Sequence, residues 1–342
     1  MLAPTWLFSD EVVTMRSLAK VQGVTRSRGV QGEAEWRAKQ RSANWRRQGV
    51  GLLWIMMVPA TAFMVVFELV PILGVVIAFM DYNPLLGFFK SPWIGLENFR
   101  WLFSLPDLSQ LLRNTIVIAV GKIILGQCSA IAFALLLNEL AQRLALFKRT
   151  VQTFTYLPHF FSWVIIGGIM MDILSSNGLV NQLLRGIGFR APPSWLGDPQ
   201  VFPLTMILSD IWKGFGWGAI IYLAAIVGVG AELYEAASID GAGRFQKMWY
   251  VTLPGIAPIV VLNLLLSLGG ILNAGFDQIL FLYNPAVFAT GDVLDTYVYR
   301  VGIQSAQWSF GQAVGLIKSV IGFVLILASW FLANKYSGWK PL

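Results

Sequence analysis

Residues 231–254 read AELYEAASIDGAGRFQKMWYVTLP and stand between two long apolar runs. This connector is short and polar, and its apolar residues are spaced as on one side of a helix. Tyr234, Ala237 and Ile239 can form one apolar face of a first short helix. Residues 240–242, Asp-Gly-Ala, are typical of a helix end followed by a tight turn, because glycine tolerates a left-handed backbone.

A second short helix is predicted from Phe245 to Tyr250, with its end at Pro254. Two such helices lying parallel to a membrane surface would make a rigid knob. A knob of this kind can dock in a groove of a soluble partner and follow its movement.

The composition indicates a membrane protein. Hydrophobic residues make up 56% of the 342 residues and charged residues only 13%, whereas a soluble globule has about 25% charged residues. A membrane-spanning helix needs about 20 mostly apolar residues. We therefore predict an all-α integral membrane protein with about six spans, at residues 51–79, 113–138, 154–174, 202–228, 256–282 and 312–333.

The basic residues predict the orientation. With residues 1–49 taken as a cytoplasmic tail, that side of the membrane holds roughly 16 Lys and Arg, and the opposite side about six. Both termini are therefore expected in the cytoplasm, and the segment from Glu33 to Arg47 is expected at the membrane surface. Membrane topology thus explains the net charge of +7, and the charge does not indicate nucleic acid binding.

The connector resembles a known motif. The residues Glu235, Ala236, Ala237, Asp240, Gly241 and Ala242, followed by Phe245 and Pro254, are similar to the EAA loop of permease subunits in bacterial binding-protein-dependent ABC importers. The resemblance implies a type I importer fold over residues 50–342, with these six residues contacting an ATPase.

The resemblance extends to the carbohydrate branch of these permeases. It covers roughly residues 50–340 and is carried by LPHF at 157–160, by residues 210–222, and by FDQILFLYNP with DTYVYRVG between 273 and 302. It implies import of an oligosaccharide or polysaccharide fragment across the cytoplasmic membrane of a bacterium.

The resemblance also implies partners. They are a second, similar permease in a heterodimer, two ATPase subunits, a solute-binding protein, the sugar and membrane lipid. No G-x-x-x-x-G-K-[ST] motif occurs, so the chain is not expected to be an enzyme or to hold a cofactor or metal. ATP and Mg²⁺ would bind the ATPase subunits. The single histidine, His159, beside Pro158, is expected to be structural.

Sugars offer apolar C–H faces and many hydroxyls, so a sugar path needs aromatic and amide side chains. The candidates are Trp212, Lys213, Trp217, Tyr222, Asn273, Asp277 and Gln278. An acidic sugar would leave Lys213 as a counter-charge, although Asp210 and Asp277 could neutralise that lysine. Lys122 and Lys318 are expected to reach the membrane surface or to pair with neighbours.

Two alternatives stay open at this point. One is an ABC importer permease for amino acids, peptides or phosphate. The other is an ion-coupled secondary transporter, which predicts inverted repeats and broken helices near mid-membrane. The sequence shows neither of these features.

Overall fold

The computed structural model describes residues 50–140 and 144–336, and their regular structure is helical. Five helices in these ranges are long and apolar enough to span a membrane, and a bent pair of helices supplies a sixth. The prediction of an all-helical membrane protein is therefore confirmed. The predicted cytoplasmic tail, residues 1–49, lies outside the described residues.

The chain divides into two compact units, of which the first ends at Gly74 and the second begins at Val75. In the first unit, α2 (Val50–Met64) leads through a π-helical turn η1 (Val65–Leu69) to α3 (Val70–Ile72). A 3₁₀ segment, η2 (Leu73–Phe79), follows, and Leu53–Phe79 qualifies as one candidate span.

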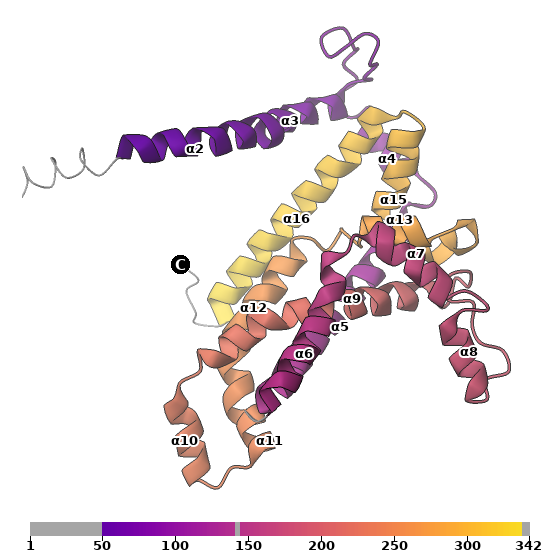
Figure 1. The fold of residues 1–342 in the computed structure, drawn as a ribbon. Coiled ribbons are helices and arrows are strands. Elements are labelled where there is room, and N and C mark those ends of the chain that lie inside the picture. Colours follow the sequence, from indigo (N-terminus) through magenta and orange to yellow (C-terminus); the bar gives the residue numbers. More distant parts are fainter. Residues whose placement is uncertain (1–49, 141–143, 337–342) are drawn as a thin grey trace, which may run out of the picture. The chain divides into compact units, whose positions relative to one another are not determined.

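The second unit holds the remaining elements (Figure 1). They are α4 (Glu97–Ser104), α5 (Leu108–Glu139), α6 (Ala145–Tyr156), η4 (Leu157–Phe160), α7 (Trp163–Ile173), α8 (Leu179–Gly186), α9 (Phe202–Val227), α10 (Ala231–Ile239), α11 (Arg244–Lys247), η5 (Met248–Thr252), α12 (Leu253–Leu268), α13 (Phe276–Leu282), η6 (Pro285–Val287), α14 (Phe288–Gly291), α15 (Leu294–Val298), η7 (Tyr299–Gln304) and α16 (Trp308–Tyr336).

The helices α5 and α9 form the most extensively packed pair in this unit. Ala130 and Ala134 of α5 are buried against Ala219 and Tyr222 of α9. Small side chains let helix backbones approach closely, and such approach drives association where lipid removes the hydrophobic effect. The spans predicted at 113–138 and 202–228 thus form the centre of the fold.

The span predicted at 154–174 is not one straight helix. A segment from Ala145 to Phe160 meets α7 at an angle of 106°. Pro158 stands in the 3₁₀ turn before the break, and Phe161 and Ser162 are extended. Proline lacks the N–H that helix continuation needs, so the turn tightens and ends there.

The span predicted at 256–282 is also wrong in its bounds. The apolar helix runs from Arg244 to Leu268 and stops at residues 269–275, and α13 then begins separately. Gly275 has a φ of +90°, a backbone conformation that few other residues adopt. One predicted span is thus a bent pair of helices, and the other starts and ends earlier than predicted.

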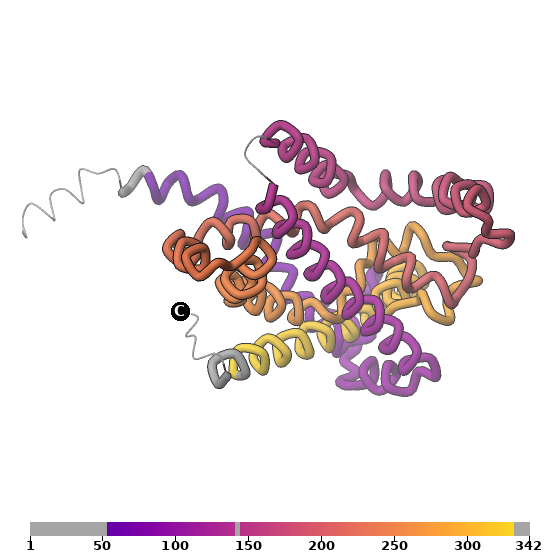
Figure 2. Tube along the Cα trace, turned by 90° about the horizontal axis from the view of Figure 1, so that it is seen from below, coloured from indigo at the N-terminus to yellow at the C-terminus, as the bar shows by residue number. Residues whose placement is uncertain are grey.

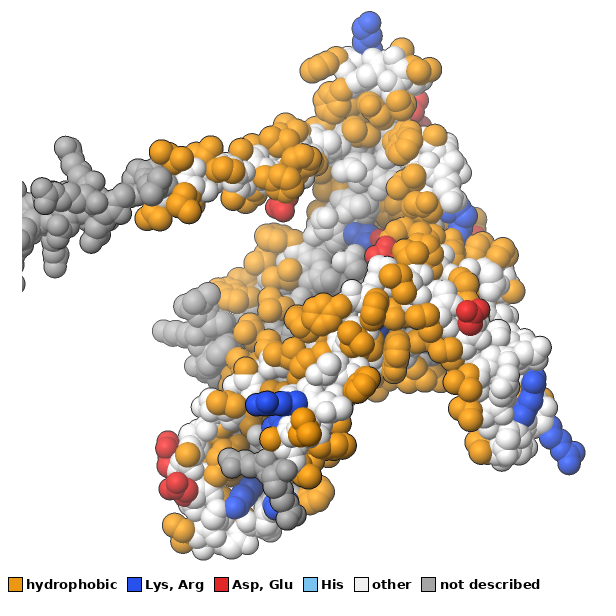
Figure 3. Space-filling view, in the orientation of Figure 1, with side chains coloured by type: hydrophobic (Ala, Val, Ile, Leu, Met, Phe, Trp, Pro, Cys, Tyr) orange, Lys and Arg blue, Asp and Glu red, His pale blue; other side chains and the backbone are white. Residues whose placement is uncertain are grey.

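The surface of the second unit follows this arrangement. In Figure 3, charged side chains gather over α10 and α11 and over α8, whereas the face between them is mostly hydrophobic. Figure 2 shows α12 and α16 side by side, in agreement with their contacts. A hydrophobic zone between polar ends is the pattern that a bilayer requires.

Candidate functional site

The connector at 231–254 forms a helical hairpin. α10 ends at Ile239, and Gly241 then adopts a φ of +79°. The Gly241 N–H donates to the Ser238 carbonyl at 3.1 Å, and the Ala242 N–H donates to the Ala237 carbonyl at 2.9 Å. These bonds satisfy carbonyls at the helix end. The predicted helix stop and left-handed glycine are confirmed.

Two side-chain contacts hold the hairpin closed. The Tyr234 hydroxyl lies 3.0 Å from the Thr252 hydroxyl. The Lys247 ammonium donates to the Ser238 hydroxyl at 2.6 Å. Each contact joins α10 to the helical segment that follows the turn, so the two halves of the hairpin are fixed to one another.

The second half of the hairpin differs from the prediction. α11 does not end as a separate helix at Pro254, because it continues through η5 into α12 without a break in the span Arg244–Leu268. Pro254 follows the π-helical turn η5 and stands at the start of α12. Only α10 is a separate short helix. The other arm of the knob is the first part of the span Arg244–Leu268.

The hairpin exposes apolar side chains at its tip. Ile239 is 87% exposed and Phe245 is 82% exposed. Tyr234 and Ala237 of the predicted apolar face are half-buried, whereas Ile239 does not pack with them. Glu235 is also exposed. An exposed apolar tip with an acidic neighbour is typical of a docking surface.

The candidate path residues of α9 fall into three environments. Lys213 and Trp217 lie one helical turn apart at the break between α6 and α7. There the Trp217 ring stacks on His159 with centroids 4.7 Å apart, and Lys213 donates to the His159 carbonyl at 3.1 Å. Trp212 lines an apolar cavity of about 360 Å³ with Trp195. Tyr222 is fully buried.

Gln278 is fully buried and its amide is engaged. Its Nε2 donates to the Met206 carbonyl and to the Ser209 hydroxyl, both at 2.8 Å, and its Oε1 accepts from Lys122. Lys122 also donates to the Ala274 carbonyl at 2.7 Å. This network joins α5, α9 and the loop before α13.

Lys122 also lies 3.7 Å from the Asp210 carboxylate. The expectation that Lys122 pairs with a neighbour is confirmed. Asp210, however, faces Lys122, so the idea that it neutralises Lys213 is wrong. A lysine at the centre of a membrane helix costs about 2.5 to 3.5 kcal/mol unless it finds partners, and these contacts supply them.

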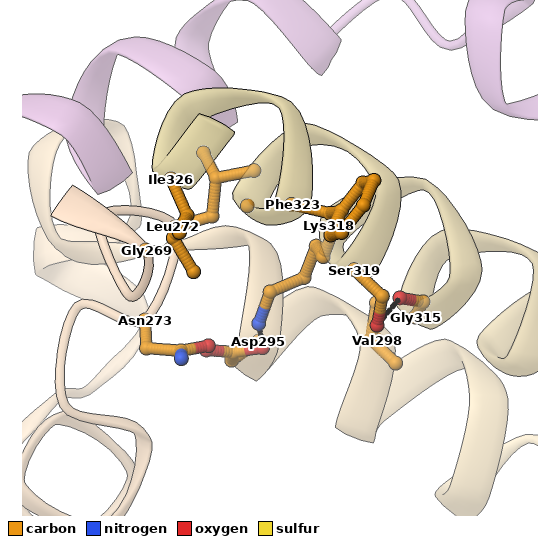
Figure 4. A pocket seen from close by; sticks show the side chains of 11 residues that line it. Gly269, Leu272, Asn273, Asp295, Val298, Gly315, Lys318, Ser319, Phe323 and Ile326 are labelled. Carbon is orange, nitrogen blue, oxygen red and sulfur yellow. Dashed lines mark hydrogen bonds and ion pairs between the residues drawn. The ribbon is translucent and has the colours of Figure 1, made fainter. Parts of the chain in front are cut away.

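Asn273 and Asp277 are both exposed at the break between α12 and α13. Asn273 lines a cavity of about 410 Å³ that is bounded by α15 and α16 as well (Figure 4). Lys318 of α16 forms an ion pair with Asp295 of α15 in that cavity. The structure thus does not gather the seven candidates into one site, and their contact with substrate stays a prediction.

The sequence does not single out three polar residues that pair with Lys318, Tyr234 and Tyr222. Asp295 forms the ion pair with Lys318, and the Thr252 hydroxyl lies against the Tyr234 hydroxyl. The Asn263 amide donates to the Tyr222 hydroxyl at 2.8 Å. Asp295 had a signal, since an unpaired Lys318 in an apolar run requires an anion from another segment.

The comparisons with known proteins bear directly on this arrangement. A family model described as "Binding-protein-dependent transport system inner membrane component" matches residues 122–337, which contain the hairpin and both broken segments. The chain belongs to this family. It is a multi-pass inner-membrane permease subunit of an ABC importer that works with a binding protein.

Two relatives come from Bacillus subtilis (strain 168). Protein LplB is 40% identical over 83% of this chain and 89% of its own length. The polygalacturonan/rhamnogalacturonan transport system permease protein YteP is 41% identical over 83% of this chain and 88% of its own length.

Solved structures show the same fold. A chain of a bacterial ABC transporter involved in the import of the acidic polysaccharide alginate superposes with a TM-score of 0.75 at 35% identity, over 83% of this chain and 96% of its own. A second structure of the alginate transporter, in complex with an alginate pentasaccharide-bound periplasmic protein, gives 0.74 at 34% identity, over 83% of this chain and 94% of its own.

Proposed function

We propose that this permease imports an oligosaccharide or a polysaccharide fragment. The observation that carries the proposal is the similarity over most of the chain to permeases named for such sugars. Exposed aromatic and amide side chains at the broken segments, among them Trp217 and Asn273, support it.

The permease pairs with a second, similar subunit, and two ATPase subunits supply the ATP-dependent step. ATP and Mg²⁺ bind those subunits and not this chain. Both termini face the cytoplasm, as the distribution of Lys and Arg favours. A solute-binding protein delivers the sugar from the opposite side.

The hairpin couples the ATPase to the membrane helices. Its tip residues Ile239 and Phe245 dock on an ATPase subunit, with Glu235 beside them. Since α11 runs directly into α12, a displacement of the tip reaches the break at residues 269–275 through one continuous helix. The contacts Tyr234–Thr252 and Ser238–Lys247 keep α10 moving with it.

Each partner then favours one of two conformations, and the cavity opens to one side at a time. Closure of the ATPases on ATP moves the knobs together and opens the path outward. Hydrolysis restores the inward-facing state.

The experiment is ATP hydrolysis by the complete complex in lipid nanodiscs with its binding protein. Arabinotriose, galactotriose, trigalacturonate, a tripeptide, an amino acid and inorganic phosphate are added one at a time. We expect stimulation by at least one trisaccharide and by none of the other solutes. Stimulation by the tripeptide, the amino acid or phosphate alone would assign the chain to a different solute class.

A further inference from the structure

The cavity between α12, α15 and α16 contains a charged pair at membrane depth. Lys318 lies about 10 residues after Trp308 and about 13 before Phe331, the two ends of the candidate span. At 1.5 Å per residue these separations are about 15 Å and about 20 Å. Half the hydrocarbon thickness is about 15 Å, so Lys318 lies near the middle of the span.

The pair remains accessible. The Lys318 side chain is 14% exposed and the Asp295 side chain is 20% exposed. In Figure 4, Lys318 reaches from α16 toward Asp295, and Asn273 points into the same space. Ionisable groups at this depth face the protein interior or a cavity, and they mark substrate paths in many membrane proteins.

Small residues from two segments line the cavity. They are Gly269, at the end of α12, and Gly315, Ser319 and Gly322 of α16. The helices pack closely at Gly322, where a side chain would lie 2.7 Å from the Gly269 carbonyl oxygen. At Gly315 the space is open, since no atom lies within 4 Å of the position a side chain would take. The space of about 410 Å³ is within the range of ligand sites, which begins near 300 Å³.

The cavity lining carries one positive and one negative side chain. Asp295 and Lys318 are the two charged residues among those that bound the cavity. An anionic ring that approached Lys318 would also meet the Asp295 carboxylate, and no further positive charge of this wall would offset that repulsion. A hydroxyl group can accept a hydrogen bond from the ammonium and donate one to the carboxylate.

We propose that Asp295, Lys318 and Asn273 form a binding site for a neutral, hydroxyl-rich sugar ring in the translocation path. The Asn273 amide both donates and accepts, and Phe323, which is 62% exposed, offers an apolar surface for the ring's C–H face. This site rests on the proposed oligosaccharide function and adds the class of ring that one wall selects.

The test replaces both charges at once, since one replacement alone would leave a partly buried charge unpaired. An ion pair that serves only as a tie between helices can be replaced by apolar residues with little loss. Asp295→Leu/Lys318→Met should therefore assemble with its partners and hydrolyse ATP at the basal rate. Val324→Met, on the same helix but outside the cavity, is the matched control.

Uptake of labelled arabinotriose, galactotriose and trigalacturonate is measured in proteoliposomes with the complete complex. We expect wild type to transport a neutral trisaccharide, and the double variant to show an apparent KM at least tenfold higher with its assembly intact. An unchanged KM in the double variant, or a wild type that transports only trigalacturonate, overturns the site. A wild type that transports none of the three removes the proposed function itself.

Discussion

The Tyr234 hydroxyl lies 3.0 Å from the Thr252 hydroxyl, and this contact joins α10 to the root of α12. Thr252 is buried and Tyr234 is half-buried, so the bond is sheltered from water. It fixes the exposed arm of the hairpin to the helix that enters the membrane.

Tyr234→Phe removes this bond and keeps the ring. A hydrogen bond of this kind contributes about 1 kcal/mol, so opening of the hairpin should increase about fivefold. Hydrogen exchange of the α10 amides in the purified complex measures this. Tyr250→Phe, on the same hairpin but 74% exposed, is the control and should leave exchange unchanged. Equal exchange in both variants would show that the contact does not hold α10.

The left-handed backbone at Gly241 gives a second prediction. No atom lies within 4 Å of the position of a side chain there, so any effect of substitution comes from the backbone. Valine should disturb the turn by about 1 to 2 kcal/mol, whereas asparagine tolerates this conformation. Gly241→Val should reduce co-purification of the ATPase, and Gly241→Asn should retain most of it. The docking role would be wrong if valine leaves both assembly and coupled hydrolysis intact.

Removing Lys122 should destabilise the protein. Lys122→Met leaves Asp210, the Ala274 carbonyl and the Gln278 Oε1 without their common donor. The loss of a buried charged partner typically costs 3 to 5 kcal/mol, and the partial exposure of Asp210 reduces this to about 2 kcal/mol. Thermal unfolding of the complex should occur several degrees lower. Lys90→Met, in an exposed loop, should not shift it.

The candidate path residues Trp217 and Asn273 give a fourth prediction. Trp217→Ala and Asn273→Ala should each lower sugar uptake several-fold and leave assembly and basal ATP hydrolysis near wild type. Trp330→Ala, which removes an indole from α16 outside the path, is the control. Normal transport by both path variants would place the sugar contacts on the partner permease.

The orientation can be tested by cysteine labelling in a Cys128→Ser background. Cysteines at Arg190 and Ala286, both exposed, should react with an impermeant reagent added outside the cell, and one at Arg244 should not. Thr290, four residues after Ala286, is less suitable for a cysteine because its hydroxyl donates to the Pro199 carbonyl. Labelling at position 244 in sealed, right-side-out cells contradicts the assignment of the hairpin to the cytoplasm.

The sequence predicts those features that depend on local chemistry. Apolar length identifies α5 and α9, and the residue type at Gly241 identifies the turn, because each signal lies within a few residues. The break after Pro158 was harder to predict, since an average of hydropathy over a window does not register two extended residues.

Contacts between distant segments could not be predicted in the same way. Gln278 carries the amide expected of a sugar path, yet it is buried because Met206, Ser209 and Lys122 surround it. Lys318 and Asp295 are separated by 23 residues, and only the return of α16 past α15 brings them together. A polar residue in a span therefore indicates a need for partners, and the fold decides whether those partners are protein or ligand.

Uptake into proteoliposomes shows directly whether this permease carries a sugar. The complete complex, with the binding protein outside and ATP inside, is supplied with labelled arabinotriose, galactotriose and trigalacturonate. We expect accumulation of at least one of these sugars, and this accumulation should depend on ATP and on the binding protein. Accumulation of none of them, by a complex that hydrolyses ATP and responds to a peptide, an amino acid or phosphate, would contradict it.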